Sequence, residues 1–143
     1  MTGTGERRFR IALVGCGRIS ERHFDAIAQQ PALRLVAVCD EIEERARQAG
    51  EKMSVPFYTN YATMLAESPA DVVAVCTPSG LHPRHGILAA EAGAHVICEK
   101  PMATRLEEAD ALVRVCDEAQ VHLFVVKQNR LNPGIQLLKR SID

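Results

Sequence analysis

The sequence predicts an α/β fold in which a doubly wound, mostly parallel sheet carries helices on both faces. Short apolar runs alternate along the chain with longer segments of helical periodicity, without a linker or internal repeat. The runs are continuously apolar, whereas strands with one face in water alternate apolar and polar residues. This pattern indicates a parallel sheet covered on both sides. With 143 residues, we expect one domain with a complete core.

The first apolar run leads directly into a glycine-rich segment. Residues 11–14 predict a buried strand, and Gly15-x-Gly17-x-x-Ser20 follows, with helix-forming residues after it. A dinucleotide-binding fingerprint requires this strand–turn–helix context. Gly15 would make the tight turn, and Gly17 would let a pyrophosphate approach the backbone at the helix N-terminus. Taken alone, the two glycines are equally compatible with an ordinary tight turn.

The second apolar run, residues 35–39, ends at an acidic residue. Asp40 lies 20 residues after Ser20, where a carboxylate can accept hydrogen bonds from the adenosine ribose. The same carboxylate would repel the 2′-phosphate of NADP, and the next residue is Glu41 rather than an arginine, so NAD is favoured. The alternative is that Asp40 caps the next helix. Strand, glycines, helix, strand and acid together predict a Rossmann fold that binds NAD.

The remaining elements follow from apolar runs and from start and stop signals. We expect helices at 19–30 and 42–50, a short helix after Asn60 that Ser68-Pro69 ends, a helix after His82 that runs to Glu91, and one from Thr104 to about residue 119. Strands are expected at 9–14, 34–39, 56–58, 71–76, 94–98 and 121–126, with an amphipathic helix after Pro133. Gly50 would end the second helix, and Asn60 would cap the third. Thr104-x-x-Glu107 would form a capping box.

Composition excludes several classes of partner. The net charge is −1 and no basic block occurs, so we expect no nucleic acid and no anionic membrane surface. No apolar run approaches the roughly 20 residues that span a bilayer, and no signal-peptide core follows Arg8, so a cytoplasmic location is expected. The five cysteines lack Cys-x-x-Cys spacing and are expected to be buried thiols, with Cys16 in the glycine loop the one to test for reactivity.

In such a sheet, ligands bind beyond the carboxyl ends of the strands. Polar residues cluster there: Gly15 and Gly17, Asp40, Thr77-Pro78-Ser79 with His82, Glu99-Lys100-Pro101, and residues 127–130. Lys100 follows a buried strand, where burial would lower its pKa and fit it for acid–base work or for binding a ribose or substrate hydroxyl. A surface lysine paired with Glu99 is the alternative. His82 and His85 lack a third ligand, so no metal site is expected.

These motifs resemble the N-terminal half of the Gfo/Idh/MocA oxidoreductases over essentially the whole chain. The segments that carry the resemblance are Gly15-Cys16-Gly17-Arg18-Ile19-Ser20, Cys39-Asp40, Thr77-Pro78-Ser79-x-x-His82 and, most specifically, Glu99-Lys100-Pro101-Met102-Ala103. Residues 127–133 are similar to a narrower branch. Its members oxidise the 3-hydroxyl of UDP-N-acetylglucosaminuronic acid for bacterial surface polysaccharide.

The resemblance implies roles for the matching positions. NAD would be bound by Gly15, Cys16, Gly17, Arg18, Ile19, Asp40, Thr77, Pro78, His82, Glu99, Lys100 and Gln128. Lys100 would also act as the catalytic residue at the reacting hydroxyl, and Asn129 and Arg130 would bind the substrate. An arginine there would pair with a uronate carboxylate or a diphosphate.

The resemblance also implies a division into domains. Residues 1–126 would form the dinucleotide-binding domain, and residues 127–143 would begin the connection to a second domain. In family members that domain supplies an Asp-x-x-x-His base, most of the sugar site and the oligomer interface. No Asp-x-x-x-His follows Lys100, so we expect a fragment that binds NAD without turnover, taken from a homo-oligomeric enzyme that binds a UDP-sugar.

Two other functions share a glycine-rich loop of this kind. A stand-alone nucleotide-sensing regulatory module would also be a single dinucleotide-binding domain, although a sensor needs no lysine at the position of Lys100. A methyltransferase would have a looser Gly-x-Gly-x-Gly loop and no Lys-Pro segment at a strand end. The sequence therefore favours the dehydrogenase and leaves the sensing module as the alternative.

Overall fold

The computed structural model describes residues 8–142. Within this range six strands form one sheet in the spatial order β3-β2-β1-β4-β5-β6, and every neighbouring pair is parallel. The strands are β1 Phe9–Val14, β2 Leu33–Cys39, β3 Phe57–Tyr58, β4 Val72–Val75, β5 His95–Cys98 and β6 Leu123–Val125. The chain winds from β1 to one edge and then from β4 to the other, so the predicted doubly wound Rossmann fold is confirmed.

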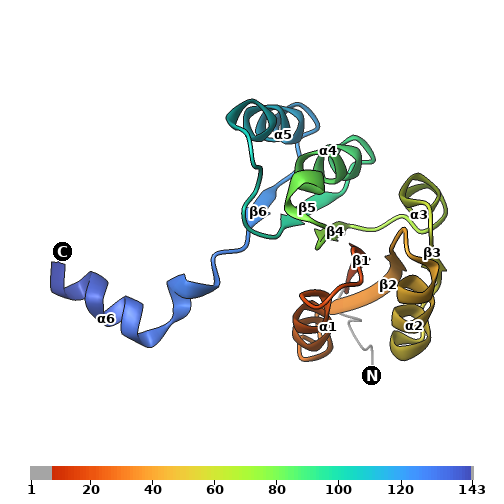
Figure 1. Ribbon diagram of the computed structural model, residues 1–143, viewed down its shortest axis with the longest axis horizontal. Helices are drawn as coiled ribbons and strands as arrows, with labels where there is room; N and C mark the ends of the chain where they lie inside the picture. The colour runs from red at the N-terminus through yellow and green to blue at the C-terminus, as the bar shows by residue number, and fades with distance from the viewer. Residues whose placement is uncertain (1–7, 143) are drawn as a thin grey trace, which may run out of the picture.

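Helices cover both faces of the sheet (Figure 1). They are α1 Ser20–Ala28, α2 Glu43–Met53, α3 Tyr61–Glu67, α4 His82–Glu91, α5 Leu106–Glu118 and α6 Pro133–Ile142, with single 3-10 turns at η1 Ser79–Leu81 and η2 Gln128–Leu131. Helices α1 and α2 pack on one face, and α3, α4 and α5 pack on the other.

The central strand β1 explains why its sequence is apolar without interruption. Ile11 and Leu13 point into the core under α1 and α2, whereas Ala12 and Val14 point into the core under α3, α4 and α5. All four side chains are buried. Since successive residues of a strand face opposite sides, a strand between two helical layers needs apolar residues at every position.

The predicted end of the second helix is wrong. Helix α2 continues past Gly50 to Met53, and Ser54 takes the left-handed conformation with φ 54°. Gly50 is buried, and a Cβ on it would lie 2.8 Å from the Cβ of Phe57 at the start of β3. The glycine therefore serves the contact between α2 and β3 rather than the end of the helix.

Of the two predicted N-terminal caps, the one at α3 is confirmed and the one at α5 is wrong. Asn60 caps α3 as expected, because its Oδ1 accepts a hydrogen bond of 3.0 Å from the Thr63 N–H. The predicted capping box of Thr104 and Glu107 is wrong. Helix α5 begins at Leu106, and the residue before it, Arg105, is extended and makes no side-chain cap bond.

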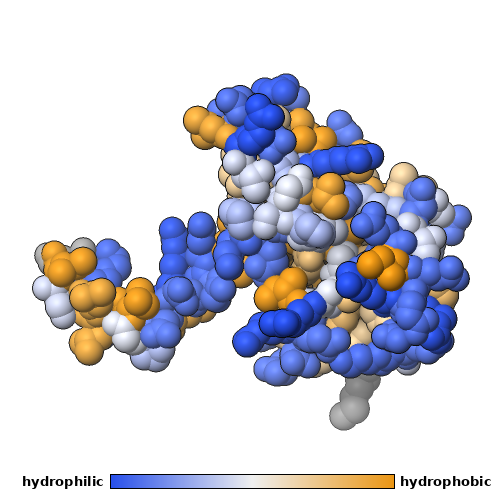
Figure 2. All heavy atoms as spheres, in the orientation of Figure 1, coloured by the Kyte–Doolittle hydropathy of each residue, from blue (hydrophilic) through white to orange (hydrophobic). Residues whose placement is uncertain are grey.

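The C-terminal helix lies apart from the sheet. Figure 1 shows α6 projecting from the rest of the domain, and Figure 2 shows apolar side chains on its visible surface. Leu131 is 80% exposed and Ile142 is 77% exposed, and Ile135, Leu137 and Leu138 are exposed as well. None of the helices in residues 8–142 has the length and apolar character needed to cross a membrane.

Candidate functional site

The topology places a crevice where the chain changes direction, between the carboxyl ends of β1 and β4. The glycine-rich loop after β1 lies against the end of β4. Gly15 has φ +95°, and a Cβ on it would lie 2.5 Å from the carbonyl carbon of Cys76 and from the amide nitrogen of Thr77. Because both atoms are backbone atoms, only glycine fits this position.

Gly17 is different, because the protein itself does not require a glycine there. No atom lies within 4 Å of the position that its Cβ would take, and its φ lies outside the left-handed range. The open space lies beside the N-terminal turn of α1, where N–H groups lack partners within the helix. The loop is thus shaped for the close approach of an anionic group from outside, as the pyrophosphate of NAD requires.

Hydrogen bonds hold the loop in this conformation. The Gly15 N–H donates to the Cys39 carbonyl at 2.8 Å. The Ser20 hydroxyl donates to the Gly17 carbonyl at 2.6 Å, and Ser20 is buried. Ser20 therefore supplies the small, closely packed residue at the third position of the fingerprint and ties the loop to α1 as well.

Asp40 lies at the end of β2 and contacts the loop. Its side chain is largely buried; Oδ2 accepts the Cys16 N–H at 2.8 Å and Oδ1 accepts the Ile42 N–H at 2.9 Å. The second bond closes a local turn before α2 and does not cap the helix, because the N-cap residue is Ile42 and no side chain makes a cap hydrogen bond there; the capping alternative is therefore wrong. Since each carboxylate oxygen has two lone pairs, acceptor capacity remains for a ligand hydroxyl.

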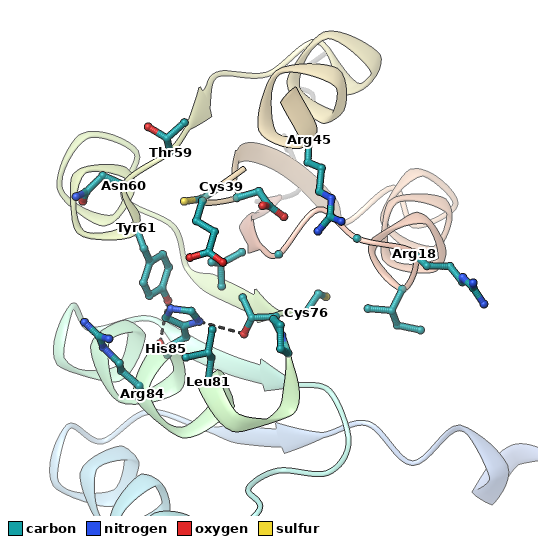
Figure 3. Close-up of a pocket in the computed structure, with 18 residues that line it drawn as sticks. Arg18, Cys39, Arg45, Thr59, Asn60, Tyr61, Cys76, Leu81, Arg84 and His85 are labelled. Carbon is teal, nitrogen blue, oxygen red and sulfur yellow. Dashed lines mark hydrogen bonds between the residues drawn. The ribbon is translucent and has the colours of Figure 1, made fainter. Parts of the chain in front are cut away.

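A cavity of about 570 Å³ opens over these residues (Figure 3). Its lining includes seven of the predicted cofactor residues, namely Gly15, Gly17, Arg18, Ile19, Asp40, Thr77 and Pro78. In Figure 3 the Arg45 side chain extends from α2 into the cavity, whereas the Arg18 side chain points away from it. Tyr61 and His85 form the opposite wall.

That wall is a chain of hydrogen bonds. The Tyr61 hydroxyl donates to the His85 carbonyl at 2.9 Å, and Nδ1 of His85 lies 3.0 Å from the hydroxyl of Thr77 (Figure 3). Burial, followed by the nearby Arg84 charge, lowers the pKa of His85, so its ring is neutral at pH 7. Burial raises the pKa of Tyr61, so its hydroxyl keeps its proton. The wall therefore presents neutral polar groups to a ligand.

Five of the predicted cofactor residues do not line this cavity: Lys100 and Gln128 line a second one, and Cys16, His82 and Glu99 line neither. His82 is buried, and its ring nitrogens lie 2.7 Å from the Pro101 carbonyl and 2.6 Å from the Thr77 carbonyl, so it lies behind the wall and joins two strand ends. Glu99 is also buried, and its carboxylate contacts His23. The Cys16 side chain turns inward, and burial followed by the Asp40 charge raises the pKa of its thiol to about 12, so it is no reactive thiolate.

Lys100 lies in a second cavity, of about 350 Å³, at the same edge of the sheet. Lys127, Gln128, Asn129 and Arg130 complete its lining. The structure thus brings Lys100 together with the three predicted residues of the segment after β6. Lys100 is exposed, so the expected burial of this lysine is wrong. The peptide bond between Lys100 and Pro101 is cis.

Sequence reasoning missed part of both cavities. Arg45, Thr59, Asn60, Tyr61 and His85 line the first cavity, and Lys127 lines the second. Thr59 and Asn60 follow β3, so the rule that directed attention to the other strand ends would have found them. Lys127 directly precedes the predicted segment. Arg45 lies within α2, and no sequence signal separates it from the other charged residues of that helix.

The fold and this crevice define a dinucleotide-binding domain. The sequence profile of the Gfo/Idh/MocA oxidoreductase family, described as an oxidoreductase family with an NAD-binding Rossmann fold, matches residues 9–127. The chain belongs to this family, and the NAD cofactor expected from the sequence is confirmed.

Two solved structures are similar to the chain at high sequence identity. The WlbA dehydrogenase from Bordetella pertussis, in complex with NADH and UDP-GlcNAcA, is 49% identical with a TM-score of 0.92, over 95% of this chain and 42% of that chain. The WlbA dehydrogenase from Chromobacterium violaceum, with the same two ligands, is 45% identical with a TM-score of 0.92, over 99% of this chain and 41% of that chain.

A curated relative is named for a substrate other than UDP-GlcNAcA. The D-apiose dehydrogenase from Paraburkholderia graminis is 37% identical over 99% of this chain and 38% of its own length. The chain thus spans about two fifths of the length of the relatives that it matches.

Proposed function

We propose that this chain is the NAD-binding part of a dehydrogenase that oxidises the 3-hydroxyl of UDP-N-acetylglucosaminuronic acid. The observation that carries the proposal is the cationic cavity at Lys100, which lies at the same sheet edge as the nucleotide cavity. The similarity to two dehydrogenases that hold NADH together with UDP-GlcNAcA supports it. In this proposal residues 1–126 form the dinucleotide-binding domain, and residues 127–143 begin the connection to the substrate-binding part.

In this proposal, different residues of the chain bind different parts of the cofactor. The N–H groups after Gly15 and Gly17 bind the pyrophosphate, and Asp40 accepts from the adenosine ribose. Thr77 and Pro78 flank the nucleotide. Glu99, Lys100 and Gln128 are assigned to the nicotinamide end, where NAD, when bound, accepts a hydride. The open space at Gly17 supports this assignment, because a methyl group there would meet a bound phosphate and nothing else.

Lys100 is assigned to the reacting hydroxyl. Its ammonium group carries three N–H donors on a flexible stem and no acceptor. A donor aimed at the hydroxyl oxygen orients the substrate and stabilises the negative charge that develops as the proton leaves. The exposure of Lys100 at the cavity supports a contact with a ligand rather than a structural pair.

The charge of the second cavity favours an anionic substrate. Lys100, Lys127 and Arg130 line it, and no carboxylate is among the described residues that do. UDP-N-acetylglucosaminuronic acid carries a diphosphate and a carboxylate, and an arginine can bind either group through paired hydrogen bonds. Neutral sugars such as apiose would leave these three cations without a partner.

The residues that line the second cavity also determine whether the chain alone can oxidise a substrate. Within residues 8–142 no carboxylate or imidazole reaches the second cavity, so the proton of the hydroxyl has no acceptor there. We therefore propose that residues 1–143 alone bind NAD without oxidising the sugar. The stand-alone sensing module finds no support in these observations, because sensing would not require a cationic cavity beside the cofactor.

Titration of the chain with NADH and NADPH, followed by NADH fluorescence, tests the cofactor part of the proposal. We expect NADH to bind more tightly than NADPH. Asp40→Ala should weaken NADH binding about 10- to 100-fold, the range expected for a hydrogen bond to a charged group. Glu43→Ala, which removes an exposed carboxylate of α2 outside the cavity lining, is the matched control. Equal binding of both nucleotides by wild type and Asp40→Ala would contradict the proposal.

Titration of the NADH-loaded chain with UDP-sugars tests the substrate part. We expect UDP-GlcNAcA to bind, with Arg130→Ala weakening it about tenfold, and Arg140→Ala on α6 serving as the control. If Arg130 pairs with the carboxylate, the variant should leave binding of UDP-GlcNAc unchanged; if it pairs with the diphosphate, both ligands should weaken. An unchanged affinity of Arg130→Ala for UDP-GlcNAcA would contradict the proposed substrate site.

A further inference from the structure

A buried carboxylate lies at the end of β5, immediately before Lys100. Glu99 is 6% exposed, although it is a charged residue at a strand end. Burying a carboxylate is costly unless hydrogen bonds replace its water. Among the residues that the structure describes, each of its two oxygens has one partner: Nε2 of His23 lies 2.8 Å from Oε1, and the backbone N–H of Lys100 donates to Oε2 at 3.2 Å.

The first partner comes from a distant part of the chain. His23 lies in α1, the helix that the glycine-rich loop opens, and is 76 residues away from Glu99. In the sheet, β4 separates β1 from β5, so this contact joins the loop side of the crevice to its far side. The His23 side chain is largely buried as well. Because a carboxylate oxygen accepts, the histidine tautomer that fits this contact is the one that donates from Nε2.

The two contacts form one chain of hydrogen bonds from α1 to Lys100. His23 fixes one oxygen of Glu99, and the other oxygen holds the backbone N–H of the residue whose side chain lines the cationic cavity. A carboxylate held at one oxygen alone can rotate about its last torsion, which is broad and two-fold for glutamate. The contact with His23 therefore decides which way the carboxylate faces.

We propose that His23 is a positioning residue for the nicotinamide end of the site. It holds Glu99 so that the carboxylate keeps Lys100 in place and keeps its remaining lone pairs free for the ligand. The inference rests on the proposed function, because it needs the nicotinamide half of NAD at Glu99 and Lys100. If His23 only packed beside the loop or capped α1, it would have no role at that end.

Binding of NADH and of ADP separates the two roles. ADP carries the adenosine and the pyrophosphate but lacks the second ribose and the nicotinamide. We expect His23→Ala to weaken NADH binding about 5- to 30-fold and ADP binding by less than twofold. His23→Gln, which restores an N–H donor, should return the NADH affinity to within about threefold of wild type. His122→Ala, at the amino end of β6, is the matched control and should change neither ligand.

Other results would overturn the inference. Equal weakening of NADH and ADP in His23→Ala would show a structural role for the whole loop, and unchanged NADH binding would show no role. If His23→Ala does not fold, His23→Phe, which keeps a ring but lacks the N–H donor, takes its place and should give the same selective loss of NADH. Failure of wild type to bind both NADH and ADP would overturn the proposed function itself, and this inference with it.

Discussion

Two glycines of one motif occupy their positions for different physical reasons. At Gly15 the protein excludes any side chain, because φ is +95° and the backbone of Cys76 and Thr77 lies where a Cβ would be. At Gly17 the protein leaves the space open. The sequence pattern treats the two as equivalent, whereas the structure requires a glycine only at Gly15, and we propose that the open space at Gly17 serves the ligand.

Alanine at each position should separate these effects. Gly17→Ala should keep the free energy of unfolding within about 0.5 kcal/mol of wild type, as substitutions in open space usually do. It should nevertheless weaken NADH binding at least about tenfold, because the methyl group meets the pyrophosphate. Gly15→Ala should lower the free energy of unfolding by at least about 1–3 kcal/mol, the cost of a strained backbone conformation. Urea unfolding and NADH fluorescence measure the two quantities, and wild-type NADH affinity in Gly17→Ala would contradict the assignment.

At the scale of the elements, the sequence was enough to predict which segments form helices and strands and in what order, but not the residues at which the helices begin and end. Continuous apolar runs identify buried parallel strands because helices cover both faces of β1 and β4. The predicted end of α2 was wrong because a glycine can either end a helix or permit a close contact with another element. Only the tertiary contact with Phe57 shows that Gly50 does the second. The predicted start of α5 was wrong because a Thr-x-x-Glu pattern reports only a local preference for a helix N-terminus. In the structure Arg105 is still extended, and the helix begins at Leu106.

Gly50→Ala is a test in which local propensity and tertiary packing predict opposite signs. Alanine is favoured over glycine in a helix by about 1 kcal/mol. A Cβ at this position would lie 2.8 Å from the Cβ of Phe57 and 3.0 Å from the Val55 carbonyl oxygen. We expect overpacking to prevail and the free energy of unfolding to fall by about 1–3 kcal/mol. Gln48→Ala, on the exposed side of α2, is the control, and a stabilised Gly50→Ala in urea unfolding would refute the packing argument.

At the scale of the whole molecule, the topology decides which parts of the site the sequence reveals. A parallel sheet gathers its strand ends at one edge, so residues after β1, β2, β4 and β5 were found without coordinates. Contacts that join elements across the sheet leave no such trace. His23 and Glu99 are 76 residues apart, and neither sequence neighbourhood indicates the other. The interior of the site therefore required the structure.

The five cysteines give the molecule a common response to alkaline pH. Burial is the main cause that raises the pKa of each thiol, to about 12 for Cys16, about 11 for Cys39 and about 12 for Cys98, and upward also for Cys76 and Cys116. In the unfolded chain a thiol titrates near its ordinary value of 9.0. Above that pH the unfolded state binds fewer thiol protons than the native state, so the free energy of unfolding falls as pH rises.

We therefore expect stability that is retained below about pH 9 and lost progressively between about pH 9 and 11. Each thiol that keeps its proton only in the native state contributes up to about 1.4 kcal/mol per pH unit. Urea unfolding at pH 8, 9, 10 and 10.5 measures the slope, and Cys76→Ala, which removes one deeply buried thiol, should make it shallower. A variant slope equal to that of wild type would mean that the thiols are not responsible. A wild-type stability that stays constant over this range would contradict the raised pKa values as a group.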